Sequence, residues 1–260
     1  MNAVLPEAIA LDFDGVLCNG LKEYFQTSLQ VYRQIWPDSC EGKDGEWEGA
    51  FGRLRPVVET GWEMPLVLQA MSQGISEGDI LENWPSIRDR IMVQEQLDRA
   101  WLGQQVDTFR DRWIADNLSS WLSLHEFYPG VSAQLRQWID QTFPVFIITT
   151  KESRFVRALL EQEGLSLPAS VIFGKDCQQP KAQTLRDLQD KGFERLWFVE
   201  DRLATLQSIQ KQPDLQTVGL FLADWGYNTE GDRTVTLADR QIGLLSLTQF
   251  GQPFEHWRID

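Results

Sequence analysis

Short apolar runs alternate with amphipathic segments along the second half of the chain. Strand-length apolar runs, rich in β-branched and aromatic residues, occupy residues 144–149, 170–173, 196–199 and 217–222. Apolar residues recur at helical spacing in residues 153–163, 181–191 and 203–211, and Gly164 and Gly192 follow the first two of these segments, as is usual after helix ends. Residues 8–12 form a fifth strand-like run. The alternation predicts an α/β fold, a Rossmann-like parallel sheet with helices on both faces.

Residues 20–125 interrupt this alternation. They contain few strand-like runs and several helical patterns, including residues 86–102 and 106–118, and they hold seven of the 11 tryptophans. Because structureless loops longer than about 15 residues are uncommon in compact domains, we expect residues 20–125 to form a separate α-helical cap. Residues 1–19 and 126–260 would then form the Rossmann-like core.

The charge of the chain narrows the range of partners. Lys and Arg total 24 against 38 Asp and Glu, a formal net charge of −14. Such a surface repels nucleic acid and anionic membranes, so we expect neither as a partner. No apolar run has the length of a membrane span, the first residues lack a signal-peptide pattern, and the three cysteines and two histidines show no metal-ligand spacing. We expect a cytoplasmic protein; nothing in the pattern indicates its oligomeric state.

Two carboxylates follow the first predicted strand. Asp12 and Asp14 flank Phe13 and precede Gly15. Ligands of open parallel sheets bind beyond the carboxyl ends of the strands, and carboxylates two residues apart can point into one crevice while Phe13 turns away to pack. Two close carboxylates repel unless a cation or a shared proton relieves them. The pattern therefore indicates a chemical site rather than solvated surface acids.

The segment of residues 12–16 resembles the first motif of the haloacid dehalogenase superfamily, an apolar strand followed by Asp-x-Asp-Gly-Thr/Val. Segments similar to the other three motifs follow in order at later strand ends and at one helix start, namely Thr149-Thr150-Lys151, Pro180-Lys181 and Glu200-Asp201. The loop at residues 224–228 is similar to the Trp-Gly-Tyr segment of phosphoglycolate-phosphatase-like members. The resemblance also places a helical cap after the first motif.

This resemblance implies a Mg²⁺-dependent phosphatase that hydrolyses a small phosphorylated metabolite through an aspartyl-phosphate intermediate. Asp12 would be the nucleophile and Asp14 the general acid and base, an aspartate that the dehalogenase members lack. Thr149 would bind a phosphoryl oxygen and Lys181 would offset negative charge. The implied Mg²⁺ ligands are Asp12, the backbone carbonyl of Asp14, Asp201 and Glu200.

Several assignments have an alternative. Lys181 is preferred to Lys175 because the helix dipole disfavours a cation at a helix start, so a lysine at that position indicates a further role. Lys151 is equally well explained as a surface charge. Thr150 is a further candidate contact for the substrate. In the insertion, Arg53 and Arg55 would bind an anionic part of the substrate, or else form ion pairs with neighbouring acids.

The motifs leave two other functions open. A phosphomutase or phosphotransferase would use the same intermediate but a different acceptor. Many members carry a second acid where this chain has Thr205, and Glu200 stands where a smaller residue is commoner. These departures are compatible with a catalytically weak binding or assembly protein of the same fold. The motifs do not identify the phosphorylated substrate.

Overall fold

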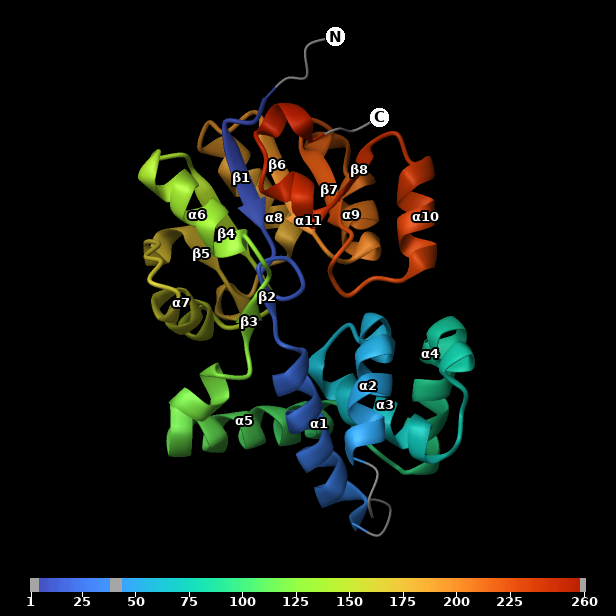
Figure 1. Ribbon diagram of the computed structural model, residues 1–260. Coiled ribbons are helices and arrows are strands. Elements are labelled where there is room, and N and C mark those ends of the chain that lie inside the picture. The colour runs from blue at the N-terminus through green and yellow to red at the C-terminus, as the bar shows by residue number, and fades with distance from the viewer. Residues whose placement is uncertain (1–4, 38–43, 258–260) are drawn as a thin grey trace. The chain divides into compact units, whose positions relative to one another are not determined.

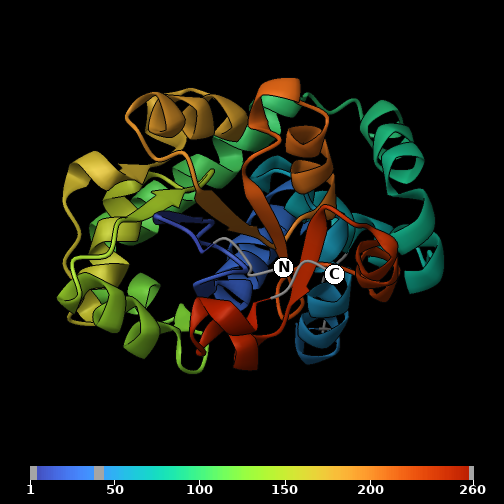
Figure 2. The same ribbon diagram turned by 90° about the horizontal axis from the view of Figure 1, so that it is seen from above.

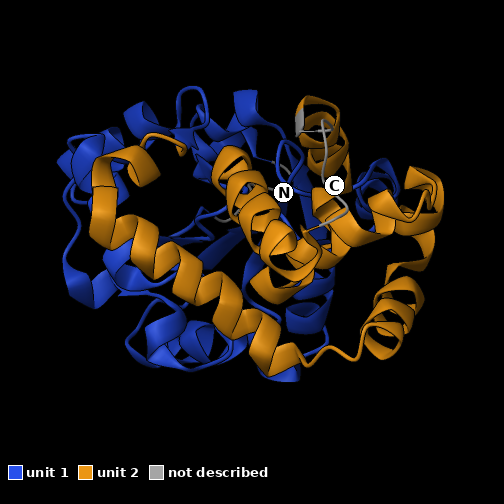
Figure 3. Ribbon diagram, turned by 90° about the horizontal axis from the view of Figure 1, so that it is seen from below, with its two compact units in different colours: residues 1–19, 126–260 blue, residues 20–125 orange. Residues whose placement is uncertain are grey.

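The computed structural model describes residues 5–37 and 44–257. The chain divides into two compact units, Met1–Asn19 with Glu126–Asp260 and Gly20–His125 (Figure 3). Both crossings between the units lie close together in one strand pair, β2 (Cys18–Asn19) with β3 (Glu126–Phe127), which is antiparallel. The sequence pattern did not indicate this strand pair, since each strand is only two residues long.

A six-stranded parallel sheet forms the centre of the first unit (Figure 1). Its strands, in spatial order, are β5 (Ile172–Phe173), β4 (Val145–Ile148), β1 (Ala8–Leu11), β6 (Leu196–Glu200), β7 (Gly219–Ala223) and β8 (Ile242–Leu245). The chain passes from β1 outward through β4 to β5 and then returns to β6 on the other side of β1. The strand order therefore reverses beside β1, where open α/β sheets bind their ligands.

Helices cover both faces of this sheet (Figure 2). Apolar side chains of α8 and α9 pack with Ala8, Ala10 and Phe198 on one face. On the other face Trp138 of α6 and Phe250 of α11 pack in an aromatic cluster with Trp197. The helices are α6 (Val131–Asp140), α7 (Ser153–Gln162), α8 (Lys181–Asp190), α9 (Leu203–Gln210), α10 (Glu230–Ala238) and α11 (Leu247–Phe250). Burial on both faces explains why the strands are continuously apolar.

The predicted α/β fold is confirmed, with a few local corrections. Gly164 and Gly192 end their helices with φ of +66° and +101°, as expected. The count of five strands was wrong, because β8 pairs in parallel with β7 and adds a sixth strand. β5 is shorter than expected, because Ala169–Val171 forms a 3₁₀ turn ahead of Ile172–Phe173.

The second unit is helical in the residues described. Its α-helices are α1 (Leu21–Ile35), α2 (Asp44–Leu54), α3 (Met64–Ser72), α4 (Glu77–Gln94) and α5 (Arg99–Leu122). The predicted helix over residues 86–102 was wrong at its centre, where the chain leaves one helix and enters the next. Gln96 takes φ of +53°, and the Asp98 side chain accepts a hydrogen bond from Trp101 N (2.9 Å) and caps α5.

Candidate active site

Asp12 leaves β1 at the carboxyl edge of the sheet. Its backbone N–H donates to Val199 O of β6 (2.9 Å), and its residue surface is only 7% exposed. Phe13 is fully buried and packs edge-on against Phe127, with ring centroids 5.7 Å apart. Gly15 then takes φ of +89°, a conformation that glycine adopts without strain. This turn lets the chain leave the strand immediately after the two aspartates.

Three buried carboxylates converge at this edge. Asp12, Glu200 and Asp201 each place a carboxylate oxygen within 4.8 Å of the others. Glu200 is fully buried and Asp201 is 2% exposed. The convergence follows from the topology, because β6 is the hydrogen-bonded neighbour of β1 and ends at the same edge. The structure thus brings Asp12 together with two residues that lie 188 and 189 positions further along the sequence.

Lys181, the first residue of α8, reaches into this cluster. Its Nζ donates to Glu200 Oε2 (2.6 Å) and lies 3.0 Å from Asp12 Oδ1. The alternative lysine, Lys175, is exposed in the 3₁₀ turn Lys175–Cys177. Of the two lysines, Lys181 is therefore the one that contacts the carboxylates.

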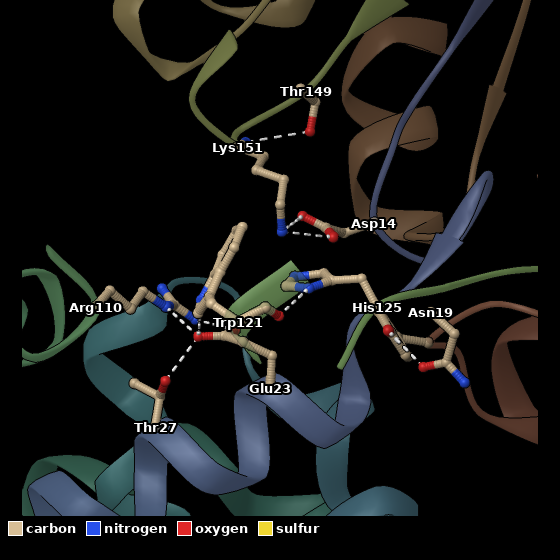
Figure 4. Close-up of polar contacts among 10 residues, drawn as sticks. Asp14, Asn19, Glu23, Thr27, Arg110, Trp121, His125, Thr149 and Lys151 are labelled. Carbon is tan, nitrogen blue, oxygen red and sulfur yellow. Dashed lines mark hydrogen bonds and ion pairs between the residues drawn. The ribbon is translucent and has the colours of Figure 1, made fainter. Parts of the chain in front are cut away.

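The segment after β4 contributes Thr149 and Lys151. Thr149 is buried, and its Oγ1 accepts a hydrogen bond from Lys151 N (3.1 Å). Thr150 is exposed. Lys151 is not the surface charge considered from the sequence, because its side chain is 7% exposed and its Nζ lies 3.0 Å from Asp14 Oδ1 (Figure 4). The one signal for this in the sequence was its position three residues after the end of β4.

Burial controls the protonation of the carboxylate cluster. Burial raises the pKa of Asp12 to about 7; the negative charge of Glu200 acts in the same direction, and Lys181 opposes it. Burial likewise raises the pKa of Glu200 above its ordinary value. For Lys181, burial acts downward, but the charges of Asp12 and Glu200 outweigh it and raise the pKa.

The cluster has the chemistry of a divalent-cation site. Its three carboxylates offer the hard oxygen ligands that such cations prefer, and Lys181 supplies one positive charge against them. Asp12 Oδ1 is buried and, apart from the ion-pair contact with Lys181, has no hydrogen-bond partner among the described residues. The Asp14 carboxylate does not belong to the cluster.

The loop after β7 holds Asp201 in place. Tyr227 N donates to Asp201 Oδ2 (2.8 Å), and Asn228 Nδ2 donates to the Asp201 carbonyl (3.0 Å). Gly226 approaches so closely that a Cβ there would lie 2.3 Å from Asp201 Cβ and 2.5 Å from the Gly15 carbonyl. The sequence indicated this loop only by its resemblance to other proteins, without a role for any of its residues.

The same loop binds the segment that follows the Asp12 turn. Trp225 Nε1 donates to Val16 O (3.1 Å), and the Tyr227 hydroxyl donates to Asn19 Oδ1 (3.1 Å). Residues 224–228 therefore fix both a carboxylate of the cluster and the chain that leaves β1.

The two arginines singled out in the second unit make contacts within that unit. Arg53 donates to Glu77 through Nε (2.8 Å) and Nη2 (2.7 Å), and its side chain is 62% exposed. Arg55 Nη1 donates to Val58 O (2.9 Å), and its guanidinium lies 4.8 Å from the ring centroid of Tyr24. The pairing of Arg53 matches the ion-pair alternative; substrate binding by either arginine remains a prediction.

A buried ion pair also lies within the second unit. Glu23 is fully buried and accepts hydrogen bonds from Arg110 (2.7 and 2.9 Å), Thr27 (2.6 Å) and Trp121 (3.2 Å) (Figure 4). These bonds join α1 to α5. This pair was not predictable from the sequence, because its partners are 87 residues apart.

Three solved structures share the fold along most of their length. A predicted phosphatase from Clostridium acetobutylicum is 13% identical, with 95% of this chain and 97% of that chain covered and a TM-score of 0.58. A predicted phosphoglycolate phosphatase from Haemophilus somnus is 13% identical, with coverages of 88% and 89% and a TM-score of 0.56. A HAD family hydrolase from Deinococcus radiodurans, solved with bound phosphate and sodium, is 13% identical, with coverages of 92% and 90% and a TM-score of 0.54.

Within the ranges that the structure describes, none of the helices combines the length and apolar character needed to cross a membrane.

Comparison with known sequences identifies the family of this chain. No curated protein sequence matches the chain significantly. The family model of the haloacid dehalogenase-like hydrolases does match, over residues 6–211, which include β1, the Asp12 turn and the whole carboxylate cluster. The chain therefore belongs to the haloacid dehalogenase-like hydrolases.

Proposed function

We propose that the protein is a Mg²⁺-dependent phosphatase that hydrolyses a small phosphorylated metabolite through an aspartyl-phosphate intermediate. The observation that carries the proposal is the position of Asp12, which touches Lys181 and shares a buried cluster with Glu200 and Asp201. Membership of a hydrolase family supports it. So does the fold shared with two structures described as predicted phosphatases and with a HAD family hydrolase that holds phosphate and sodium.

In the first step a carboxylate oxygen of Asp12 attacks the phosphorus atom. The bond from phosphorus to the leaving oxygen breaks as the bond to Asp12 forms, and Asp14 gives its proton to the leaving oxygen. Lys181 offsets negative charge beside Asp12. The Thr149 hydroxyl already accepts from Lys151 N, so its own proton is available for a phosphoryl oxygen.

In the second step water attacks the phosphorus of the aspartyl phosphate. Asp14, now a carboxylate, takes a proton from this water as the new phosphorus–oxygen bond forms. The bond between Asp12 and phosphorus breaks, which restores the Asp12 carboxylate and releases inorganic phosphate. Asp14 ends the cycle protonated, as it began.

The metal in this proposal is Mg²⁺, held by the carboxylates of Asp12, Glu200 and Asp201 together with the Asp14 backbone carbonyl. When bound, the ion neutralises charge on the nucleophile and the phosphoryl oxygens. The support is the fit of the residues, three buried carboxylates of which two, Asp12 and Glu200, contact Lys181. Tyr227 N and the close approach of Gly226 keep the Asp201 carboxylate oriented.

We assign residues 20–125 as the cap of this enzyme, the unit that would supply substrate contacts beyond the phosphoryl group. Arg53 and Arg55 are the candidates for an anionic substrate group. Binding at Arg53 would have to replace its two hydrogen bonds to Glu77. Thr150 is the further candidate in the core, where it is exposed after β4.

Phosphate release from a panel of phosphorylated metabolites, with Mg²⁺ and with EDTA, tests the proposal. We expect Mg²⁺-dependent turnover that Asp12→Asn abolishes while the protein stays folded. Asp190→Asn is the matched control, because Asp190 is exposed at the end of α8. Addition of sugar acceptors separates hydrolysis from phosphoryl transfer by the product formed. A folded protein that hydrolyses no phosphoester and co-purifies with a partner would support the binding-protein alternative instead.

A further inference from the structure

Lys151 is a buried cation at the carboxyl edge of the sheet for which the two steps above have no role. Its side chain is 7% exposed, although lysines ordinarily keep the ammonium group in water. Its Nζ lies 3.0 Å from Oδ1 and 3.3 Å from Oδ2 of Asp14, so the ammonium group contacts both carboxylate oxygens (Figure 4). Among the described residues, Lys151 is the only cation paired with Asp14.

The backbone of Lys151 is fixed on both sides. Its N–H donates to Thr149 Oγ1 (3.1 Å), and its carbonyl accepts from Lys175 N (3.0 Å). Gly174 makes this second contact possible, because a Cβ there would lie 2.6 Å from the Lys151 carbonyl oxygen. The ammonium group is therefore held by a braced turn rather than by a free surface loop.

The two lysines of the site are divided between the two aspartates. Lys181 contacts Asp12 and Glu200, whereas Lys151 contacts Asp14. They come from different elements, since Lys181 begins α8 and Lys151 follows β4. We propose that Lys151 is the positioning residue for the general acid and base, holding the plane of the Asp14 carboxyl group toward the leaving oxygen.

This assignment rests on the proposed function and gives it a specific consequence. Proton transfer requires the Asp14 carboxyl within hydrogen-bond reach of the leaving oxygen, about 2.6–3.2 Å. Asp14 is only partly buried, with 14% of its side chain exposed, and a carboxyl group without its partner can rotate away. In the first step, loss of Lys151 therefore slows substrates whose leaving group needs a proton and spares substrates whose leaving group departs as a stable anion. The second step is the same for both kinds of substrate.

The test compares two substrates on one preparation of each variant. One is the alkyl phosphate that the wild-type enzyme hydrolyses best; the other is 2,4-dinitrophenyl phosphate, whose leaving group needs no proton. For Lys151→Met we expect kcat/KM on the alkyl phosphate to fall about 100-fold, within the range that general acid catalysis provides. We expect kcat/KM on the activated ester to fall less than about 3-fold. Both values report only the steps up to departure of the leaving group, so they leave out the hydrolysis of the aspartyl phosphate, which is the same for both substrates. The ratio of the two values does not depend on the folded fraction of the preparation.

Two further variants sharpen the result. Lys211→Met is the matched control, because Lys211 is exposed and forms no side-chain hydrogen bond or ion pair within the described residues; its substrate ratio should equal that of the wild type. In an Asp14→Asn background, Lys151→Met should cause little additional loss on the alkyl phosphate, since the group that it positions is already gone.

The outcomes separate the two proposals. Equal loss on both substrates, or no loss on either, overturns the role of Lys151 while phosphatase activity of the wild type stands. A full additional loss in the Asp14→Asn background overturns it as well. If the wild-type protein hydrolyses neither substrate nor any other phosphoester, the proposed function fails and the role of Lys151 fails with it.

Discussion

Gly15 and Asp201 leave no room for a side chain between them. A Cβ at Gly15 would lie 2.0 Å from Asp201 Oδ2 and 2.6 Å from Asp201 Cγ, although the two residues are 186 positions apart. Gly226 also lies close to Asp201, since a Cβ there would be 2.3 Å from Asp201 Cβ. The position of the Asp201 carboxylate, which we assign as a metal ligand, therefore requires glycine at positions 15 and 226 as well as the groups that donate hydrogen bonds to Asp201.

Gly15→Ala is expected to disturb both stability and metal binding. The new methyl group must move Asp201, and the alanine must adopt φ of +89°; overpacking and left-handed strain together cost about 2–5 kcal/mol. Gly130→Ala is the control, because Gly130 has φ of +83° with nothing near a Cβ. It should lower the melting temperature modestly and leave Mg²⁺ affinity unchanged by calorimetry. Equal Mg²⁺ affinities in the two variants would contradict the role of Asp201.

Lys181→Met should disable the site, and Lys175→Met should not. Lys181 contacts Asp12 and Glu200, whereas Lys175 is exposed. Removing one partner of a buried ion pair typically costs about 3–5 kcal/mol, because it leaves uncompensated charge. We expect kcat for phosphate release to fall at least 100-fold in Lys181→Met, in the range of lost electrostatic stabilisation. Similar kcat values in the two variants would remove Lys181 from the mechanism.

The stability of the metal-free protein should fall as pH rises from about 4 to about 7. The pKa of Asp12 is raised from 3.8 to about 7, chiefly by burial and then by Glu200. In that window the folded protein keeps a proton on Asp12 that the unfolded chain has released. This one proton lowers the free energy of unfolding by at most about 1.4 kcal/mol for each pH unit of increase. Urea unfolding at several pH values, with EDTA, measures this slope.

Two additions make the pH experiment specific to Asp12. Asp12→Asn should flatten the slope, because the neutral amide does not titrate. Mg²⁺ should also flatten it, because the ion displaces the proton from the same oxygens and the folded protein then holds no extra proton to release. A slope that Asp12→Asn leaves unchanged would mean that another group is responsible.

The two described cysteines should differ in reactivity. Cys18 is fully buried, and burial, followed by the nearby charge of Asp14, raises the pKa of its thiol. Cys177 is exposed. Because the thiolate is the reactive form, iodoacetamide at pH 8 should label Cys177 and spare Cys18 in the native protein. Peptide mass spectrometry reports each site separately; Cys40 lies outside the described residues. Prompt labelling of Cys18 in the native protein would contradict its burial.

Two arginines of the second unit should contribute very differently to its stability. Arg110 pairs with the fully buried Glu23, whereas the Arg53 pair with Glu77 is exposed. Arg110→Met is expected to destabilise the protein by about 3–5 kcal/mol, and Arg53→Met should leave the melting temperature nearly unchanged. Comparable shifts in thermal unfolding would show that burial of Glu23 has been assigned wrongly.

The parts of the fold that depend on local pattern were predictable from the sequence. The strands at β1, β4, β6 and β7 are short apolar runs because both faces of the sheet are covered, and Gly164 and Gly192 mark helix ends by their positive φ. β8 was missed, since Gly243 interrupts the apolar run of Ile242–Leu245. Its strand character comes from pairing with β7, which no local window reveals.

In the site, too, features with a local sequence pattern were predictable and long-range pairings were not. The strand-end positions of Asp12, Glu200 and Asp201 predicted that these residues would meet, because parallel strands end at one edge. The partner of Lys151 was not predictable, since a lysine appears as a surface charge until Asp14 lies opposite it, 137 residues away. Glu23 and Arg110 are a similar case, with 87 residues between them. Long-range ion pairs carry no periodic signal in the sequence.

Chemical trapping of the phosphorylated enzyme tests the central claim most directly. Borohydride reduces an aspartyl phosphate to homoserine, so the wild-type protein should be quenched during turnover, reduced, digested and sequenced by mass spectrometry. The account predicts homoserine at position 12 in the presence of substrate and Mg²⁺, and an unchanged peptide when either is omitted. Sustained phosphate release with no modification at Asp12, or modification at a different carboxylate, would contradict it.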